Sequence, residues 1–291
     1  MTHASPHPFG QVVFAGGGNR CFWQAGFWSI AAPALDLRPR RIAAVSAGAA
    51  VSALIVAGRA ESTLRHFQRM TAANPTNLHL RNLFGPQPIV PHAEMYRGAL
   101  RHALDDEAVA RIRAGPDLRV LLAAVPRWLG PRSGVVAGFL AYEIEKRLRQ
   151  PVHPVGGRRL GFQPLVVSLG SCRDAEEMIA LILASSSTPP MAPVARWAGR
   201  TVLDGGLVDN VPVAALEAGS AGRPDSTPET STLVLLTRPY PVERLPRVAG
   251  RTYVQPSREV PVSKWDYTNP DGLQQAWDLG RDDAEDFIAS R

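Results

Sequence analysis

The sequence predicts an α/β fold in which helices cover both faces of a mostly parallel sheet. Short apolar runs with strand-like composition recur along the chain, and helix-like segments separate them. Alternation of this kind is typical of βαβ units, whose strands are buried on both sides. The chain has 291 residues, of which 45% are hydrophobic, which is enough for one large core. We therefore expect a single domain over residues 1–291.

The expected strands are recognised by apolar runs of five to nine residues, bounded by turn residues or charges. They lie at residues 11–16, 41–46, 117–125, 164–170, 200–204, 232–237 and 251–255. Between the second and third runs, residues 61–114 read as helices broken near Asn74-Pro75 and at 84–86. We expect this segment to form a helical cap or side lobe of the domain.

The other segments are assigned from their turn and capping residues. Residues 219–232 (GSAGRPDSTPETST) are rich in Gly, Pro, Ser and Thr, and strand-like sequence follows at once, so we expect a surface loop inside the domain. Near the C-terminus, Asn269 is a candidate N-cap with Pro270 at the first helical position. Apolar residues then recur on one face of the expected helix, at Leu273, Trp277, Phe287 and Ile288.

The charge pattern argues against a nucleic-acid partner. The net charge is +6, but Lys146 and Lys264 are the only lysines, and the arginines are dispersed without a basic run or a nucleic-acid motif. Weak attraction to the headgroups of an anionic membrane surface remains open.

Compartment and cofactors are judged from the termini and the cysteines. The N-terminal segment lacks the basic and apolar regions of a secretory signal, and no apolar segment is long enough to span a bilayer. Cys21 and Cys172 suit a reducing compartment and lack the neighbours of a metal site. We expect a cytoplasmic protein, with peripheral membrane contact as an option, that needs no metal and no cofactor.

Three glycines, Gly16-Gly17-Gly18, follow the first expected strand. Backbone amides without a neighbouring Cβ can converge on an anion, either a dinucleotide phosphate or the oxyanion of acyl transfer. The dinucleotide pattern fails because Cys21 occupies its third glycine position and Asp36 precedes the next strand. The acyl-transfer interpretation is favoured.

The second expected strand leads to a candidate nucleophile. Ala44-Val45-Ser46-Ala47-Gly48 joins a strand to an Ala-rich helix, as in a nucleophile elbow, where small neighbours let the serine occupy a strained turn. Gly48 fits that requirement, while Ala44 stands where the elbow pattern has its first glycine. The alternative is an ordinary serine at a helix start.

A serine hydroxyl needs a base to take its proton. The histidines are at positions 3, 7, 66, 79, 92, 102 and 153, and none follows the late strands, where the usual Ser-Asp-His order would place it. Asp204 ends a late strand and is followed by Gly205 and Gly206, so it could accept the proton directly if burial raises its proton affinity. Asp209 is a competing acid without that placement, and a plain turn is the other explanation.

Together these pieces resemble the patatin-like phospholipases. GGGNR at 16–20, VSAGA at 45–49 and LDGGLVDNVP at 203–212 are similar to that family's oxyanion loop, elbow and Asp-Gly-Gly motif, in the same order. Supporting matches lie at 184–190 (ASSSTPP) and 279–284 (LGRDDA). The chain departs from the pattern at Ala44 and at Cys21, each of which replaces a glycine.

The resemblance implies a three-layer α/β/α fold and a lipid acyl hydrolase with a Ser-Asp dyad and an acyl-enzyme intermediate. Ser46 is then the nucleophile and Asp204 the base. The oxyanion would be held by the backbone amides of five residues: Gly16, Gly17, Gly18, Asn19 and Arg20. The supporting residues are Gly48, Gly205, Gly206 and Asn210.

The expected substrates are carboxylic esters of phospholipids or lysophospholipids, which makes the protein a serine esterase of the phospholipase A type. The alternative is a patatin-fold module that binds lipid or protein with weak or absent catalysis. Phe22, Trp23, Phe27 and Trp28 are expected in the core, with an acyl pocket as their second possible place. The sequence leaves the oligomeric state open.

Overall fold

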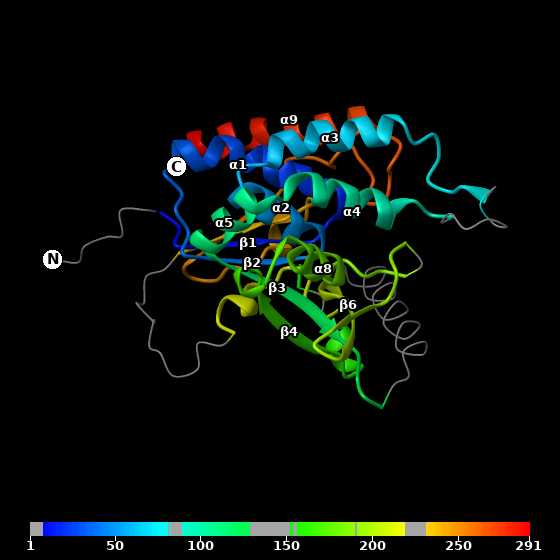
Figure 1. Cartoon of the computed structure of the whole chain (residues 1–291). Helices are drawn as coiled ribbons and strands as arrows, with labels where there is room; N and C mark the ends of the chain where they lie inside the picture. The colour runs from blue at the N-terminus through cyan, green and yellow to red at the C-terminus, as the bar shows by residue number, and fades with distance from the viewer. Residues whose placement is uncertain are drawn as a thin grey trace.

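The computed structural model describes residues 8–80, 82, 89–128, 152–153, 156–189, 191–218 and 231–291. Within this part of the chain, eight strands form one sheet in the order β5-β6-β3-β2-β1-β7-β8, with β4 also paired to β3. The mostly parallel α/β sheet predicted from the sequence is confirmed (Figure 1).

The centre of the sheet is parallel. It consists of β1 (Gln11–Phe14), β2 (Arg41–Val45), β3 (Asp117–Ala124), β7 (Thr232–Leu235) and β8 (Arg251–Val254). Phe14 pairs with Ala44 of β2 and with Leu235 of β7, so the strands end at one common edge. The glycine loop and the elbow both follow strands that end at this edge.

Each of the other strands pairs antiparallel with its neighbour. They are β4 (Gln163–Ser168) and β6 (Arg200–Asp204), which both pair with β3, and β5 (Ala195–Trp197), which pairs with β6. The sequence analysis did not anticipate β5, because three residues are too short to show an alternating pattern. At Leu122, β3 pairs with Asp204, which brings the end of β6 beside the centre of the sheet.

Side chains alternate between the two faces of the sheet, as the geometry of a strand requires. Val12 and Phe14 of β1 point into the main core, whereas Val13 points to the opposite face and packs with Val213 and Leu216. Both faces are therefore buried, as predicted for a sheet with this composition.

The main helical layer covers one face of the sheet. It contains α1 (Phe22–Ala34), α2 (Ala47–Val56), α8 (Ala175–Ser185) and α9 (Pro270–Ala289). Helices α1 and α9 lie side by side, which explains why the first and last helices of the chain share one core (Figure 1). Asn269 caps α9, because its side chain accepts a hydrogen bond of 2.8 Å from the Gly272 amide.

Three further helices fall within residues 61–114 or begin beside them. They are α3 (Ala60–Ala72), α4 (His92–Ala103) and α5 (Asp106–Ala114). Helix α3 packs on α4 and α9, and α4 packs on α8, so these helices extend the main helical layer. Residue 81 and residues 83–88 of the expected cap, and residues 219–230 of the expected loop, lie outside the described residues.

Short helices lie on the chain connections. They are α7 (Gly156–Arg159) and the 3-10 helices η1 (Gly18–Cys21), η3 (Leu169–Ser171), η4 (Gly205–Leu207), η5 (Val213–Leu216) and η6 (Val242–Arg244). η5 contributes Val213, Ala215 and Leu216 to the core of the second face.

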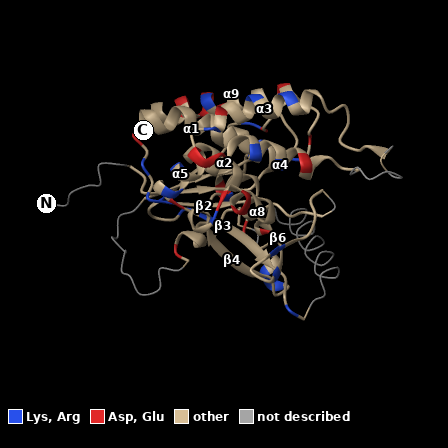
Figure 2. Ribbon diagram, in the orientation of Figure 1, with Lys and Arg blue, Asp and Glu red and all other residues tan. Residues whose placement is uncertain are grey.

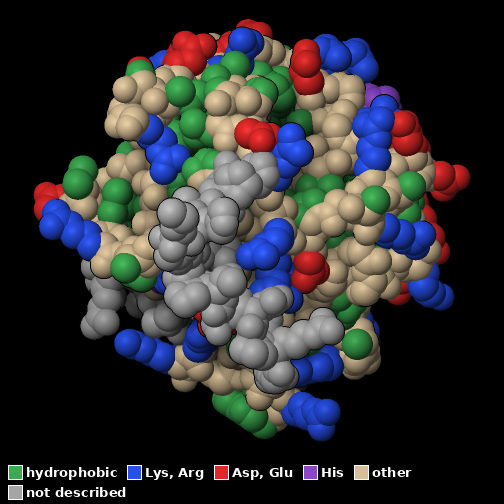
Figure 3. All heavy atoms as spheres, turned by 90° about the vertical axis from the view of Figure 1, so that its left-hand side faces the viewer, with side chains coloured by type: hydrophobic (Ala, Val, Ile, Leu, Met, Phe, Trp, Pro, Cys, Tyr) green, Lys and Arg blue, Asp and Glu red, His purple; other side chains and the backbone are tan. Residues whose placement is uncertain are grey.

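Charged residues of both signs are spread along the helical layer, and others lie among the strands and the short connections (Figure 2). On the face drawn in Figure 3, Lys and Arg side chains are interspersed with acidic, hydrophobic and other side chains. No helix in the described part of the chain combines the length and the apolar composition that a bilayer crossing requires.

Candidate active site

Ser46 lies in the turn between β2 and α2, with backbone angles φ 55° and ψ −135°. Residues other than glycine rarely adopt a positive φ, and such strained positions cluster at active sites. The turn carries the hydroxyl at the carboxyl edge of the sheet, where a parallel α/β fold places its ligands. Ala44 is fully buried in β2, and the strained turn forms with alanine at that position.

The Ser46 hydroxyl donates a hydrogen bond of 2.7 Å to Oδ2 of Asp204. Asp204 is the last residue of β6, and its Oδ1 accepts a bond of 2.7 Å from the Gly206 amide. The exposed fraction is 4% for Ser46 and 5% for Asp204. The fold thus brings together two side chains that are 158 residues apart in the sequence.

Burial raises the pKa of the Asp204 carboxyl above its usual range, while the Lys264 charge and the bonds from Ser46 and Gly206 lower it. A higher pKa makes the carboxylate a stronger base. Asp209, the competing acid, is engaged elsewhere, because its Oδ1 accepts a bond of 2.9 Å from the Val211 amide.

The glycine loop lies directly beside Ser46. A Cβ on Gly16 would come within 3.3 Å of the Ser46 Cβ and within 2.7 Å of Asn210 Oδ1. The Gly16 carbonyl accepts hydrogen bonds from Asn210 Nδ2 (3.1 Å) and Thr237 Oγ1 (2.8 Å). Asn210 therefore fixes the loop, and Thr237 is a positioning partner that the sequence analysis did not single out.

The amides of the loop are not equally available. Gly16 N–H donates to the Asn210 carbonyl at 3.1 Å, and Asn19 N–H donates to the Lys264 carbonyl at 3.2 Å. Within the described part of the chain, the amides of Gly17 and Gly18 donate no hydrogen bond. These two are the candidate oxyanion donors that the geometry leaves open.

The remaining loop residues have structural contacts. Arg20 Nε donates to the Gly17 carbonyl at 3.3 Å, which braces the loop from the 3-10 turn. Burial raises the pKa of the Cys21 thiol to about 12, and its Sγ lies 3.6 Å from the Ala15 carbonyl. Cys21 is thus a neutral packing residue at the position where the family pattern has glycine.

Two supporting glycines permit close backbone contacts. A Cβ on Gly48 would lie 2.5 Å from the Ala15 carbonyl oxygen, and a Cβ on Gly205 would lie 2.2 Å from that of Leu121. Real Cβ atoms essentially never come so near another atom. The absence of a side chain at Gly48 therefore lets α2 approach the end of β1.

Ser185 is a further positioning residue. Its hydroxyl accepts a hydrogen bond of 2.8 Å from the Ser46 amide and donates one of 2.7 Å to the Leu121 carbonyl, tying the elbow to β3. The signal in the sequence was the ASSSTPP segment at 184–190, which the sequence analysis noted only as a supporting match. Pro190 of that segment lies outside the described residues.

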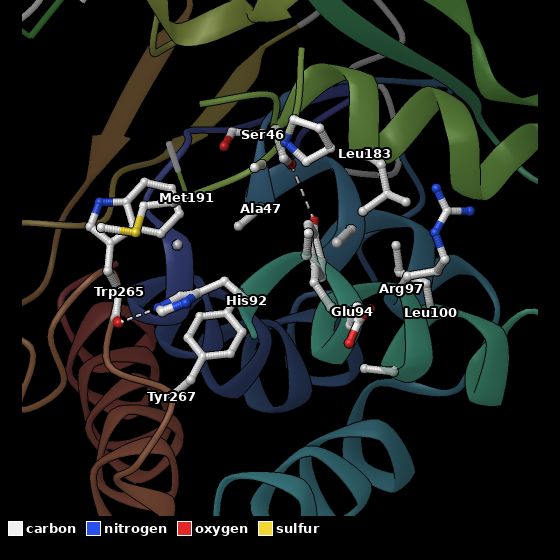
Figure 4. Close-up of a pocket in the computed structure, with 18 of the residues that line it drawn as sticks. Ser46, Ala47, His92, Glu94, Arg97, Leu100, Leu183, Met191, Trp265 and Tyr267 are labelled. Carbon is white, nitrogen blue, oxygen red and sulfur yellow. Dashed lines mark hydrogen bonds between the residues drawn. The ribbon is translucent and has the colours of Figure 1, made fainter. Parts of the chain in front are cut away.

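An apolar cavity of about 1030 Å³ opens beside Ser46. Helices α2, α4 and α8 contribute most of its walls, together with residues 191–196 and the aromatic side chains of Trp265 and Tyr267 (Figure 4). Among the predicted aromatic residues of α1, Phe22 lines this cavity, whereas Trp23 and Phe27 are fully buried in the core. A mostly apolar cavity with a few polar groups is typical of a small-molecule site.

The described histidines have other contacts. His92 lines the cavity, but its Nε2 is bonded to the Trp265 carbonyl at 2.8 Å (Figure 4). His153 lies 3.3 Å from Asp209, and the ring of His66 is stacked on that of His102. The Ser46 hydroxyl donates its hydrogen bond to Asp204 and not to a described histidine.

Comparison with known proteins identifies the family. Residues 12–217 match the family model of the Patatin-like phospholipases. No curated protein matches the chain. The matched range includes the glycine loop, the elbow and the Asp-Gly-Gly motif, and it spans more than half of the chain. The chain therefore belongs to the patatin-like phospholipase family, a family of hydrolases.

Proposed function

We propose that the protein is a serine acyl hydrolase that cleaves carboxylic ester bonds of phospholipids or lysophospholipids. The observation that carries the proposal is the 2.7 Å bond from Ser46 Oγ to a buried Asp204 carboxylate, at the edge of an apolar cavity. Nucleophile, base and an apolar binding space are the parts that covalent ester hydrolysis requires.

In the proposed mechanism, Ser46 Oγ attacks the carbonyl carbon of the ester while its proton passes to Asp204 Oδ2. The developing oxyanion accepts hydrogen bonds from the Gly17 and Gly18 amides. The bond to the alcohol then breaks, and the alcohol leaves with the proton from Asp204. Water attacks the acyl-enzyme, again giving its proton to Asp204, and the free acid is released as Ser46 regains its hydrogen.

We also propose that the mouth of the cavity meets the lipid surface. Leu78 and Val194 line the cavity with exposed fractions of 49% and 42%, and Arg196, two residues after Val194, is also an exposed lining residue. Apolar side chains next to an arginine suit the boundary between acyl chains and anionic headgroups.

Labelling with a fluorophosphonate, read by intact mass, tests the dyad. We expect one adduct on the native chain, none on Ser46→Ala and sharply slower labelling of Asp204→Asn. Ser52→Ala is a matched control, because Ser52 lies further along α2 and its hydroxyl donates to the Ala49 carbonyl at 3.0 Å. A folded native chain that takes no adduct would contradict the proposal.

A further inference from the structure

The cavity beside Ser46 continues along one face of α2. Ala47, Ala50, Val51 and Leu54 line it, and these positions i, i+3, i+4 and i+7 share one side of a helix. Two other helices also line it, through Ala99 and Leu100 of α4 and Ala180, Leu183 and Ala184 of α8. The space starts at the nucleophile, because Ser46 directly precedes α2.

The residues of α2 that line the cavity are largely buried. Ala50 and Leu54 are 5% and 4% exposed, and Leu100 opposite them is 1% exposed, although all three line the cavity. The exposed lining residues lie elsewhere in the sequence: Leu78, Glu94, Pro193, Val194 and Arg196. A buried apolar space that begins at a nucleophile favours an apolar chain over the polar portion of a substrate.

We propose that the acyl chain of the substrate lies along this face of α2 and that Leu54 limits its length. The inference rests on the proposed function and names the substrate class, esters with an acyl chain of about eight carbons. The seven residue steps from Ala47 to Leu54 advance the helix by about 10 Å. Each carbon advances an extended chain by about 1.3 Å, because a C–C bond is about 1.5 Å long.

The cavity is larger than one acyl chain requires, and the rest of it could hold the alcohol portion of the ester. A cavity of about 1030 Å³ lies at the top of the range of about 300–1,000 Å³ for ligand sites. It therefore exceeds what one such chain fills. The part lined by the exposed residues Leu78, Val194 and Arg196 is left for the alcohol portion of the ester.

The test is the dependence of kcat/KM on chain length for 4-nitrophenyl esters from acetate to palmitate. Ala50 lies three residues beyond Ala47, or about 4.5 Å along the helix. A leucine there blocks the chain after about four carbons. We expect Ala50→Leu to lower the octanoate-to-butyrate ratio of kcat/KM at least about tenfold. Leu54→Ala should shift the optimum the other way, toward longer chains.

Ala110→Leu is the matched control, because it makes the same change at an exposed position of α5 outside the cavity. If Ala50→Leu does not fold, Ala180→Leu replaces it in the test, because it narrows the same space from α8. It should lower the same octanoate-to-butyrate ratio of kcat/KM. Folded variants with the native chain-length profile would overturn the inference while the proposed function stands. A native protein that hydrolyses no ester and takes no fluorophosphonate adduct would instead refute the proposed function, and the inference with it.

Discussion

Replacement of Asp204 by Asn separates the chemistry of the dyad from its packing. The two side chains have the same shape, and the Asn oxygen can still accept the bond from the Gly206 amide that Asp204 accepts at 2.7 Å. What is lost is the ability to take the Ser46 proton. Loss of a general base lowers the rate by about 10²–10⁴-fold. This corresponds to about 3–5.5 kcal/mol of transition-state stabilisation.

The same variant has a predictable effect on stability. Burial raises the pKa of Asp204 in the folded protein. Between the usual pKa and the raised one, the folded protein binds the proton more tightly than the unfolded chain. The free energy of unfolding therefore falls as the pH rises through this range and Asp204 ionises. Below the usual pKa, Asp204 is protonated in both states and this loss of stability is absent. Neutral Asn removes the loss, so we expect the Tm of Asp204→Asn at pH 7 to equal or exceed that of the native protein.

The assay is kcat/KM for 4-nitrophenyl butyrate, together with thermal unfolding at pH 7. Asp209→Asn is the matched control, because Asp209 is buried nearby and its Oδ1 accepts from the Val211 amide, which Asn can also do. The control should keep its activity within a few-fold. Retention of more than a tenth of the native kcat/KM by Asp204→Asn would refute the assignment of the base.

Three further predictions concern charge, strain and close packing. Lys264→Met should move the acid limb of the pH profile of kcat/KM to higher pH, because the Lys264 charge lowers the pKa of Asp204. Lys264→Arg keeps the charge and should leave the acid limb in place. An acid limb that stays in place in Lys264→Met and moves in Lys264→Arg would contradict the electrostatic role. Ser46→Gly should be more stable to urea than Ser46→Ala by about 1 kcal/mol, since glycine relieves the φ of 55°; equal stability would argue against strain. Gly48→Ala should lower the free energy of unfolding by about 1–3 kcal/mol, because its Cβ would lie 2.5 Å from the Ala15 oxygen, whereas helix propensity alone predicts a gain.

The sequence by itself determined the local features of this protein. Each predicted apolar run overlaps an observed strand, and Asn269 caps the last helix as its pattern predicts. Ser46 and Asp204 were predicted as a candidate dyad because a turn between a strand and an Ala-rich helix, and an acid before two glycines, are encoded by neighbouring residues. Such features depend on backbone preferences and side-chain size within a few residues.

Only the tertiary structure decided what depends on contacts between distant segments. The antiparallel pairing of β3 with β4 and β6 does not follow from strand composition, yet it sets the position of Asp204 beside Ser46. Hydrogen bonds to Asn210 and Lys264 occupy two of the five predicted oxyanion amides. The cavity likewise exists because α2, α4 and α8 meet without filling the space between them. Distances across a fold result from how all the elements pack together, and no local pattern contains that information.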